Sequence, residues 1–356
     1  MFGFFKVLTT PLFGLDISSS SVKAVEISQV AGGYCVEAYG IELLPAQSVV
    51  DRNIKDSAKV ATAIRQLVKR IGISRKFCAI GVAGSSVITR ILQMSAGFDE
   101  QLIIQQIQTE ADRYIPYPLE EVYYDHEVLG IYQKNPEFVD VLLAAARIDT
   151  VDLKKNTVTE AGFKTTIVDI ESLAIERAFA LAVNHLPKNE LTHHIALIDI
   201  GSTNTDIYVF QNLRTIYNRS QAFGGKHLSD EIQRRYGLSE EEAIAAQKYG
   251  GLPEDYTTEV LEPFKETVVQ QINRALQVYF SSTDEAQINF VALAGGVGML
   301  PGLDALVQSK LGVKTFVANP FLEMQVSKNI DKNMLLDDGP SLMMACGLAL
   351  RNFSDE

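Results

Sequence analysis

The sequence has few of the features that mark membrane-spanning, disulfide-stabilised or zinc-binding proteins. Its 356 residues include only three cysteines, Cys35, Cys78 and Cys346, which lie in apolar surroundings without the spacing of metal ligands. We therefore predict that the three cysteines are reduced core residues of a cytoplasmic protein. No apolar run approaches the roughly 20 residues of a membrane-spanning helix, and no secretory signal is evident.

Positive charge is also scarce. The chain has 32 Lys and Arg against 44 Asp and Glu, a net charge of −12 at pH 7, and no run of basic residues. Because proteins that bind nucleic acids present basic patches to the phosphates, this balance argues against nucleic acid as the main partner. Hydrophobic residues, in contrast, make up 47% of the chain, which is enough for a soluble protein of two domains with sizeable cores.

Residues 199–210, DIGSTNTDIYVF, predict a β-hairpin with the Asp199 carboxylate at its mouth. An apolar strand at 195–198 leads into it, and β-branched and aromatic residues form the return strand. The turn between the strands consists of Gly201, Ser202, Thr203 and Asn204. Such a turn presents backbone N–H groups and hydroxyls with little side-chain bulk, which suits phosphate oxygens.

Residues 16–27, DISSSSVKAVEI, predict a second hairpin of the same kind. Its polar turn includes Ser18 and Ser19, and Lys23 lies on the return strand, where its ammonium can reach back to a phosphate. Two related Asp turns indicate that the chain has two related halves. The alternative is two ordinary hairpins with solvated Asp and Ser, because short motifs often arise by chance.

The two aspartates suggest a metal ion. Carboxylates that face a polyphosphate repel it unless a cation lies between them. Mg²⁺ usually keeps several waters and is held by one or two carboxylates plus the phosphates. Asp16 and Asp199 are therefore candidate magnesium residues that act through bound water.

The first part of the chain alternates strands and a helix as an α/β domain does. We expect strands within 14–50 and at 77–82 and 87–94, and a helix at 54–71 that Gly72 ends. A separate block of elements follows. We expect a helix at 99–114, which Pro116 and Pro118 end. Strands at 122–130 and 139–146 and a helix at 149–161 come after it. This block is large enough for a small inserted subdomain.

Glu171 begins an alanine-rich helix predicted at 170–186. A carboxylate there can interact with the helix dipole or, if the helix start faces a cleft, orient a water for attack on a phosphate. Acidic residues are common in the first turn of helices, so the first reading is the simpler one.

The second half of the chain has two glycine pairs, one before a predicted helix and one after a predicted strand. Gly224 and Gly225 open a helix at 227–236, where a phosphate or ribose can approach free N–H groups. Gly295 and Gly296 follow a strand at 288–294 and allow a flat base to lie against the backbone. Taken alone, each pair is merely a tight turn.

The order of these features resembles the actin and Hsp70 ATPase fold over nearly the whole chain. Longer stretches resemble the PilM family, cytoplasmic actin-like proteins of type IV pilus assembly: GLDISSSSVKAVEI, GSSVITRILQMSA, EADRYIPYPLEEVYYDHEVLG, VLLAAARIDTV and AGFKTTIVDIESLAIERAF. The resemblance implies an α/β fold with two lobes around a nucleotide cleft and an inserted subdomain like that of FtsA. The first lobe would comprise 1–88, 166–193 and 341–356, the insert 89–165, and the second lobe 194–340.

The resemblance also implies roles for individual residues. The first phosphate loop would contain Asp16, Ser18, Ser19 and Lys23, and the second would contain Asp199, Gly201, Ser202, Thr203 and Asn204. Gly224, Gly225, Gly295 and Gly296 would border the ribose and adenine of ATP or ADP, bound with Mg²⁺. Glu171 aligns with the water-positioning acidic residue of bacterial actins, so slow hydrolysis and no hydrolysis both stay open.

The partner implied by the resemblance is PilN, an inner-membrane protein. A groove between the insert and the first lobe would receive its short N-terminal cytoplasmic segment, and the YIPYP corner is a candidate neighbour of that groove. Other pilus assembly proteins are further candidate partners. This places the protein in the cytoplasm at the inner face of the bacterial inner membrane.

Two alternatives stay open. The first is a working ATPase or small-molecule kinase of the same fold. A kinase needs a dedicated catalytic Asp and a sugar-sized polar site between the lobes, and we identify neither. An FtsA-like cell-division protein usually ends in a basic amphipathic helix, whereas residues 351–356, RNFSDE, are acidic. We therefore expect membrane association through a partner.

Overall fold

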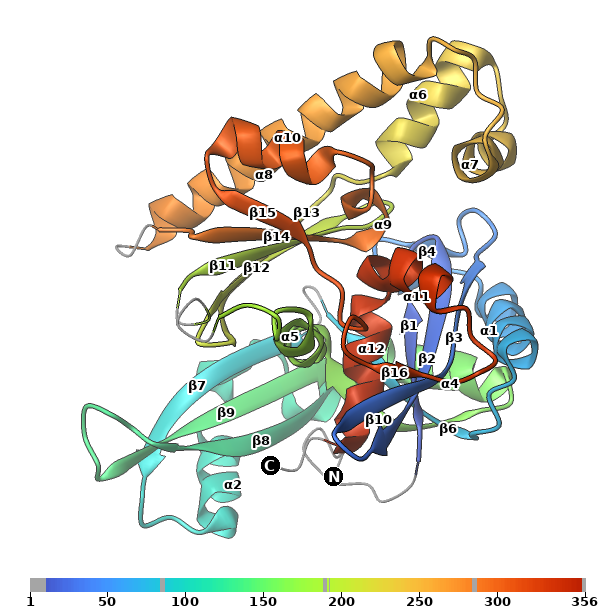
Figure 1. Ribbon diagram of the computed structural model, residues 1–356. Helices are drawn as coiled ribbons and strands as arrows, with labels where there is room; N and C mark the ends of the chain where they lie inside the picture. The colour runs from blue at the N-terminus through green and yellow to red at the C-terminus, as the bar shows by residue number, and fades with distance from the viewer. Residues whose placement is uncertain (1–10, 84–86, 188–190, 192, 284–286, 354–356) are drawn as a thin grey trace. The chain divides into compact units, whose positions relative to one another are not determined.

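The computed structural model describes residues 11–83, 87–187, 191, 193–283 and 287–353 (Figure 1). The chain forms two compact units, the first made of residues 1–29, 37–174 and 348–356 and the second of residues 30–36 and 175–347. Residues 354–356, which include the acidic Asp355 and Glu356 on which the contrast with FtsA partly rests, lie outside the described residues.

The first unit is built on a six-stranded sheet with the strand order β10-β6-β1-β2-β3-β16. Strand β1 pairs antiparallel with β2 and parallel with β6, and β6 pairs parallel with β10. The strands are β1 (Phe13–Ile17), β2 (Ser21–Val30), β3 (Gly33–Leu43), β6 (Phe77–Val82), β10 (Lys164–Ile170) and β16 (Gln325–Val326). β16 and the first residues of β3, with which it pairs, belong to the second unit.

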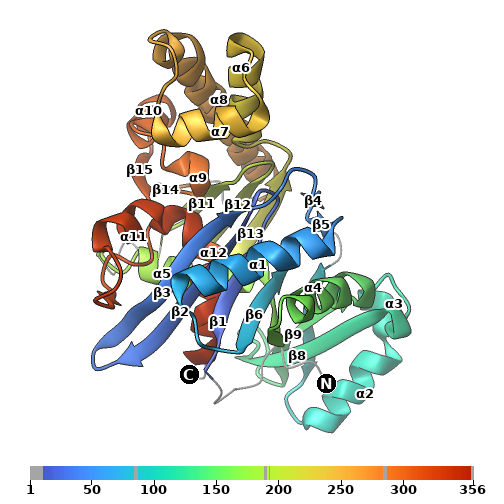
Figure 2. The same ribbon diagram turned by 90° about the vertical axis from the view of Figure 1, so that its right-hand side faces the viewer.

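Helices α1 (Ser57–Ile71) and α4 (Ile148–Glu160) lie side by side against this sheet (Figure 2). The predicted helix start at Ile54 is wrong. The Asp56 carboxylate accepts a hydrogen bond from the Lys59 N–H and so caps the helix there. Ile54 instead lies in β5 (Asn53–Ile54), which pairs with β4 (Val49–Val50). Gly72 ends α1 with a φ of 75°, as predicted.

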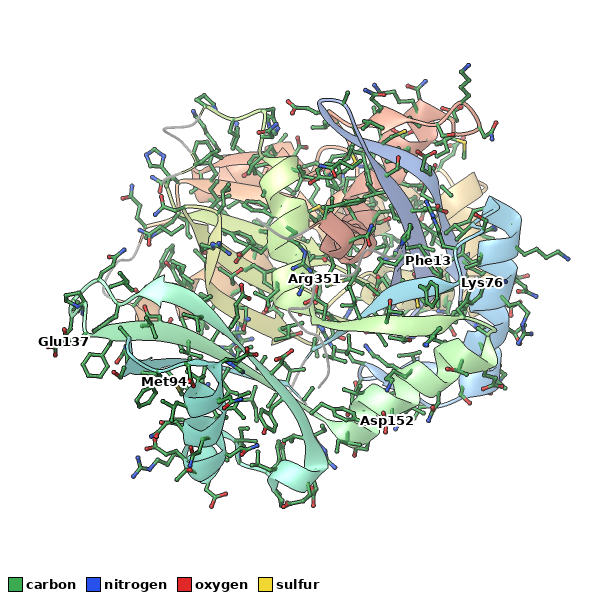
Figure 3. All side chains as sticks on the ribbon, turned by 90° about the horizontal axis from the view of Figure 1, so that it is seen from below. Phe13, Lys76, Met94, Glu137, Asp152 and Arg351 are labelled. Carbon is green, nitrogen blue, oxygen red and sulfur yellow. The ribbon has the colours of Figure 1, made fainter. Side chains whose placement is uncertain are left out.

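A three-stranded sheet with the order β7-β9-β8 has a core of its own. Its strands are β7 (Val87–Ser95), β8 (Val122–Ile131) and β9 (Phe138–Arg147), and helices α2 (Glu100–Thr109) and α3 (Ala111–Tyr114) follow β7. In Figure 3, Met94 lies beside α2 and Glu137 at the far end of the β8–β9 hairpin. The expected single helix is broken at Glu110, whose carboxylate accepts from the Tyr114 hydroxyl at 2.6 Å.

The second unit contains a five-stranded sheet with the order β13-β12-β11-β14-β15. Strand β11 pairs antiparallel with β12 and parallel with β14. The strands are β11 (Ile195–Ile200), β12 (Thr205–Gln211), β13 (Arg214–Gln221), β14 (Phe290–Ala294) and β15 (Lys314–Val317). Hydrophobic side chains from this sheet and from α8 (Glu262–Ser282) share one core, as the apolar strand at 195–198 predicted.

The remaining helices of the second unit are shorter. They are α6 (Lys226–Tyr236), α7 (Glu240–Tyr249), the π-helical turn η3 (Thr257–Leu261), α9 (Gly295–Gly298), α10 (Leu303–Leu311), α11 (Lys332–Asp338) and η4 (Gly339–Leu342). Helices α5 (Glu171–Ala182) and α12 (Met343–Leu350) each begin in one unit and end in the other. Helix α7 was not anticipated, although Ser239 and Glu242 form the reciprocal capping pair that marks a helix start.

None of the three cysteines forms a disulfide bond; Cys78 and Cys346 are buried and Cys35 is half-buried. Burial disfavours the thiolate, so it raises the pKa of Cys78 to about 12 and also raises the pKa of Cys346. Within the part of the chain that the structure describes, no helix has the length and apolarity to cross a bilayer.

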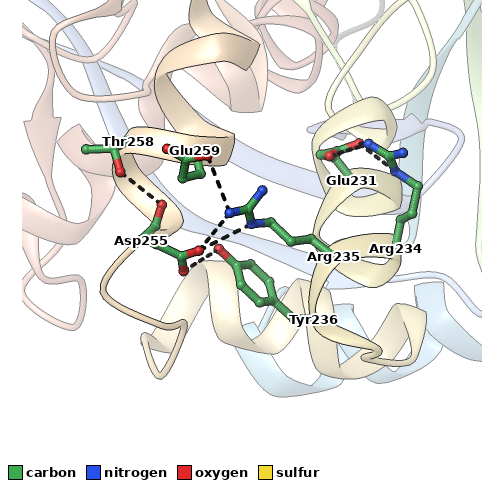
Figure 4. Close-up of polar contacts among 7 residues, drawn as sticks. All are labelled: Glu231, Arg234, Arg235, Tyr236, Asp255, Thr258 and Glu259. Carbon is green, nitrogen blue, oxygen red and sulfur yellow. Dashed lines mark hydrogen bonds and ion pairs between the residues drawn. The ribbon is translucent and has the colours of Figure 1, made fainter.

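A polar network joins α6 to the segment that precedes α8 (Figure 4). The Arg235 guanidinium lies 2.8 Å from an Asp255 oxygen and 3.4 Å from Glu259, and the Tyr236 hydroxyl donates to Asp255 at 3.0 Å. These donors stabilise the charged carboxylate, with Arg235 contributing most, and therefore lower the pKa of Asp255.

We expect this network to contribute stability only while Asp255 is charged. Its pKa is lower in the folded than in the unfolded chain, so the contribution is present above the unfolded value of about 3.9 and is lost as pH falls through the folded pKa. Asp255→Asn should lower the free energy of unfolding in urea at pH 7 and have a smaller effect at pH 3, below the unfolded pKa. Glu254→Gln, an exposed neighbour, is the control. A loss of the same size at both pH values would contradict the prediction.

Candidate functional site

The first predicted phosphate turn joins β1 to β2 in the first unit. Asp16 and Lys23 lie opposite each other on these strands, and the Lys23 ammonium is 3.5 Å from Asp16 Oδ2. Ser18 closes the turn, because its N–H and its hydroxyl both donate to the Ser21 carbonyl, at 3.0 and 2.8 Å. Ser19 is half-buried in the same turn. The four residues predicted here are thus brought together.

The second predicted turn joins β11 to β12 in the second unit. The Gly201 N–H donates to the Asn204 carbonyl at 2.9 Å, and the Thr203 hydroxyl donates to the Asn204 side chain at 2.8 Å. Residues 201–204 are all half-buried, so their polar groups are partly accessible. This is the compact polar turn that the sequence predicted.

Asp206 is a charged residue beside the second predicted turn that the sequence reasoning missed. It lies directly opposite Asp199 on the paired strands, at the position that Lys23 occupies opposite Asp16. Like charges placed opposite each other on neighbouring strands destabilise a sheet, and a cation bound nearby would remove this repulsion. The shared spacing of seven residues in the two hairpins was the sequence signal for it.

Gly295 packs directly against the Asp199 carboxylate. Asp199 pairs with Ala294, the last residue of β14, and Gly295 follows with a φ of 78°. A Cβ at Gly295 would lie 2.5 Å from Asp199 Oδ1 and would also collide with the Ile200 carbonyl, so only glycine fits. Gly296 is exposed and has open space around its α-carbon, as a surface for a flat ring requires.

Gly224 and Gly225 hold the start of α6 against the second turn. The Gly225 N–H donates to the Gly201 carbonyl at 2.9 Å, and the Lys226 N–H donates to the Ser202 carbonyl at 2.8 Å. A Cβ at Gly224 would lie 2.5 Å from both carbonyl oxygens. The N–H groups expected to be free at this helix start are therefore used within the protein, and the glycines permit close backbone packing.

Glu171 begins α5 as predicted, but it is already held by two cations. Arg52 Nη1 is 3.0 Å from Glu171 Oε2, and Lys154 Nζ is 3.7 Å from Oε1. The sequence gives no local signal for these partners, since Arg52 precedes Glu171 by 119 residues. They were found only in the folded chain.

Each predicted hairpin, taken by itself, carries carboxylates of a kind that suits magnesium. Among the described residues, no group of three or more His, Cys, Asp or Glu side chains could hold a metal ion. Mg²⁺ does not need one, because it takes oxygen ligands and binds through one or two carboxylates together with phosphates and waters. Asp16 in the first unit and the Asp199–Asp206 pair in the second supply carboxylates of this kind.

The fold is that of actin-like proteins. Cell division protein FtsA of Bacillus subtilis (strain 168) is 23% identical over 346 residues, which cover 86% of this chain and 78% of FtsA. A structure described as the PilM-PilN type IV pilus biogenesis complex matches with a TM-score of 0.79 and 23% identity, covering 98% of this chain and all of that one. MreB5 of Spiroplasma citri bound to ADP matches with a TM-score of 0.50 and 14% identity, covering 95% of each chain. The predicted actin-like ATPase fold is confirmed.

The family follows from a separate comparison. The model of the family described as type IV pilus assembly protein PilM matches residues 14–353, almost the whole chain. This protein is therefore a member of the PilM family of type IV pilus assembly proteins.

Proposed function

We propose that this protein is an ATP-binding scaffold of the type IV pilus assembly platform, at the cytoplasmic face of the inner membrane. The observation that carries the nucleotide part is the matched pair of hairpins. Each has a carboxylate, a polar turn and a second charged residue opposite the carboxylate. Family membership carries the pilus part.

Bound Mg·ATP would bring the positive charge that the Asp residues require. Asp16 and Asp199 would hold the magnesium through water, and Asp206 would add to the negative potential around Asp199. Ser18, Ser19, Ser202 and Thr203 would offer hydroxyl and N–H donors to phosphate oxygens, and Lys23 would share its charge between Asp16 and a phosphate. Gly295 and Gly296 would leave room for the purine. The ADP in the MreB5 structure supports nucleotide binding by this fold.

The N-terminal cytoplasmic segment of PilN is the proposed partner. Support comes from the PilM-PilN complex, which matches this chain over nearly its whole length. The YIPYP corner after α3 borders a hollow of about 550 Å³, lined among others by Ile115, Pro116, Tyr117 and Leu119. Apolar and aromatic side chains of this kind suit a short peptide segment. Binding PilN would hold the protein at the membrane through its partner.

The experiment that tests the nucleotide role is to incubate the purified chain with Mg·ATP, desalt it and chromatograph the nucleotide that stays bound. We expect intact ATP, because Glu171 is engaged by Arg52 and Lys154. Recovery of ADP would identify a working ATPase. A protein free of nucleotide would contradict the proposed function.

Asp16→Ala and Asp199→Ala should each weaken Mg·ATP binding by about tenfold or more, since each removes a charged group from the metal site. Lys23→Ala should weaken it through loss of a phosphate contact. A fluorescent ATP analogue and a titration with Mg²⁺ measure the dissociation constants. Asp230→Ala, which removes an exposed ion pair with Lys226, is the control. Unchanged affinity in both Asp variants would remove these residues from the site.

Tyr117→Ala should weaken binding of a labelled peptide with the sequence of the PilN N-terminus by about tenfold, because it removes an aromatic side chain from the hollow. Fluorescence anisotropy measures the affinity. Tyr132→Ala, at the far end of the β8–β9 hairpin, is the matched control. Equal affinities for Tyr117→Ala and the unaltered protein would place the peptide elsewhere.

A further inference from the structure

Arg52 lies in a backbone conformation that its side chain does not favour. It is the second residue of the two-residue turn between β4 and β5, and Asp51 and Arg52 have φ values of 49° and 64°. Such turns favour Gly and Asn, because positive φ is costly for other residues. Strained positions of this kind persist where the surrounding structure or a function requires them. The contacts of the Arg52 side chain therefore need to account for an arginine at a position that favours glycine or asparagine.

That side chain ends at Glu171. Arg52 Nη1 donates to Glu171 Oε2 at 3.0 Å, and both groups are largely shielded from solvent, with 27% and 15% of their side chains exposed. Ion pairs screened from water are stronger than exposed ones. The β4–β5 turn is thus tied to the start of α5.

The other oxygen of Glu171 faces a buried ammonium. Lys154 on α4 has only 8% of its side chain exposed, and its Nζ lies 3.7 Å from Glu171 Oε1. The same ammonium donates to the Gly81 carbonyl at 2.7 Å. A buried lysine must be paired to remain charged, so Glu171 and Gly81 provide the partners of Lys154.

We propose that Arg52 and Lys154 form a latch that holds Glu171 in ion pairs and so suppresses hydrolysis of bound ATP. The latch rests on the proposed function, in which ATP binds, and on the water-orienting role that the resemblance implies for Glu171. Arg52 and Lys154 act as positioning residues, since they act through Glu171. A carboxylate with a cation at each oxygen is a weak acceptor for the hydrogens of a water molecule.

The suppressed reaction is ordinary hydrolysis. The oxygen of water bonds to the γ-phosphorus, and the bond between that phosphorus and the β,γ-bridging oxygen breaks with its electron pair on ADP. The products are ADP and inorganic phosphate. The proton lost by the water goes to the phosphate or to solvent. Loss of Arg52 would remove the cation 3.0 Å from Glu171 Oε2 and so make the carboxylate a better acceptor for that water.

The test is single-turnover hydrolysis of radiolabelled Mg·ATP by the full chain. Arg52→Gln should raise the rate at least about tenfold with an unchanged ATP dissociation constant, given that a positioned base contributes roughly 10²–10⁴-fold. Arg52→Lys keeps the charge and should stay near the unaltered rate. Arg65→Gln is the control, because Arg65 is exposed and bonds only to the Glu160 carbonyl among the contacts described. The gain must disappear in the double variant Arg52→Gln, Glu171→Gln.

Lys154→Met extends the test to the second cation, and Lys155→Met, at the next position on α4, is its control. Lys154→Met should also raise the rate, whereas Lys155, which pairs with Asp152, should not matter. Because a buried lysine can be needed for folding, thermal unfolding is measured for each variant. If Lys154→Met fails to fold, the Arg52 variants decide the outcome alone.

A second readout does not need ATP. Urea unfolding of Arg52→Gln, Glu171→Gln and the double variant forms a double-mutant cycle. If the latch exists, the double variant loses less free energy of unfolding than the sum of the losses in the two single variants. Additive effects would overturn the latch. Normal ATP binding with an unchanged or lower rate in Arg52→Gln would also overturn it and leave the scaffold standing. An unaltered chain that binds no ATP would overturn the proposed function and the latch together.

Discussion

Backbone packing around Asp199 is the constraint on which the second unit's part of the site depends. Gly224 approaches the turn carbonyls from one element and Gly295 approaches the carboxylate from another, each too closely for any side chain. Hydrogen bonds from Gly225 and Lys226 then fix the turn itself. The glycines therefore act by giving the turn one conformation. A rigid turn can present its donors to a phosphate without paying the entropy of ordering them on binding.

The two hairpins are alike in backbone and different in charge. Asp16 faces a lysine, so its charge is partly neutralised within the chain, whereas Asp199 faces a second aspartate. The proposed magnesium would add positive charge beside Asp199 and Asp206, whereas Asp16 already has the Lys23 ammonium 3.5 Å away. We infer that the second hairpin is the one whose stability responds more to magnesium.

Local features of the sequence predicted most of the fold. Strand β6 was placed correctly because an apolar run of its length and β-branched content has few other interpretations, and Gly72 marked the end of α1. Errors arose where local geometry overrode periodicity: a side-chain cap begins α1 at Asp56, and the backbone of Glu110 is non-helical, with a φ of −109° and a ψ of 13°. Arg52 and Lys154 could not be predicted, because their pairing with Glu171 depends on how distant segments meet. Asp206 was predictable only by comparing the two hairpins position by position.

Gly81 places a limit on how this family member can evolve. A Cβ at position 81 would lie 2.8 Å from Cγ of Glu171, and the Gly81 carbonyl also holds Lys154. A side chain at position 81 would therefore displace the glutamate from its ion pairs. Natural variants should keep glycine at 81 as long as they keep glutamate at 171. Where residue 171 is replaced by one with a shorter side chain, residue 81 can vary. The two positions, 90 apart in the chain, are expected to change together.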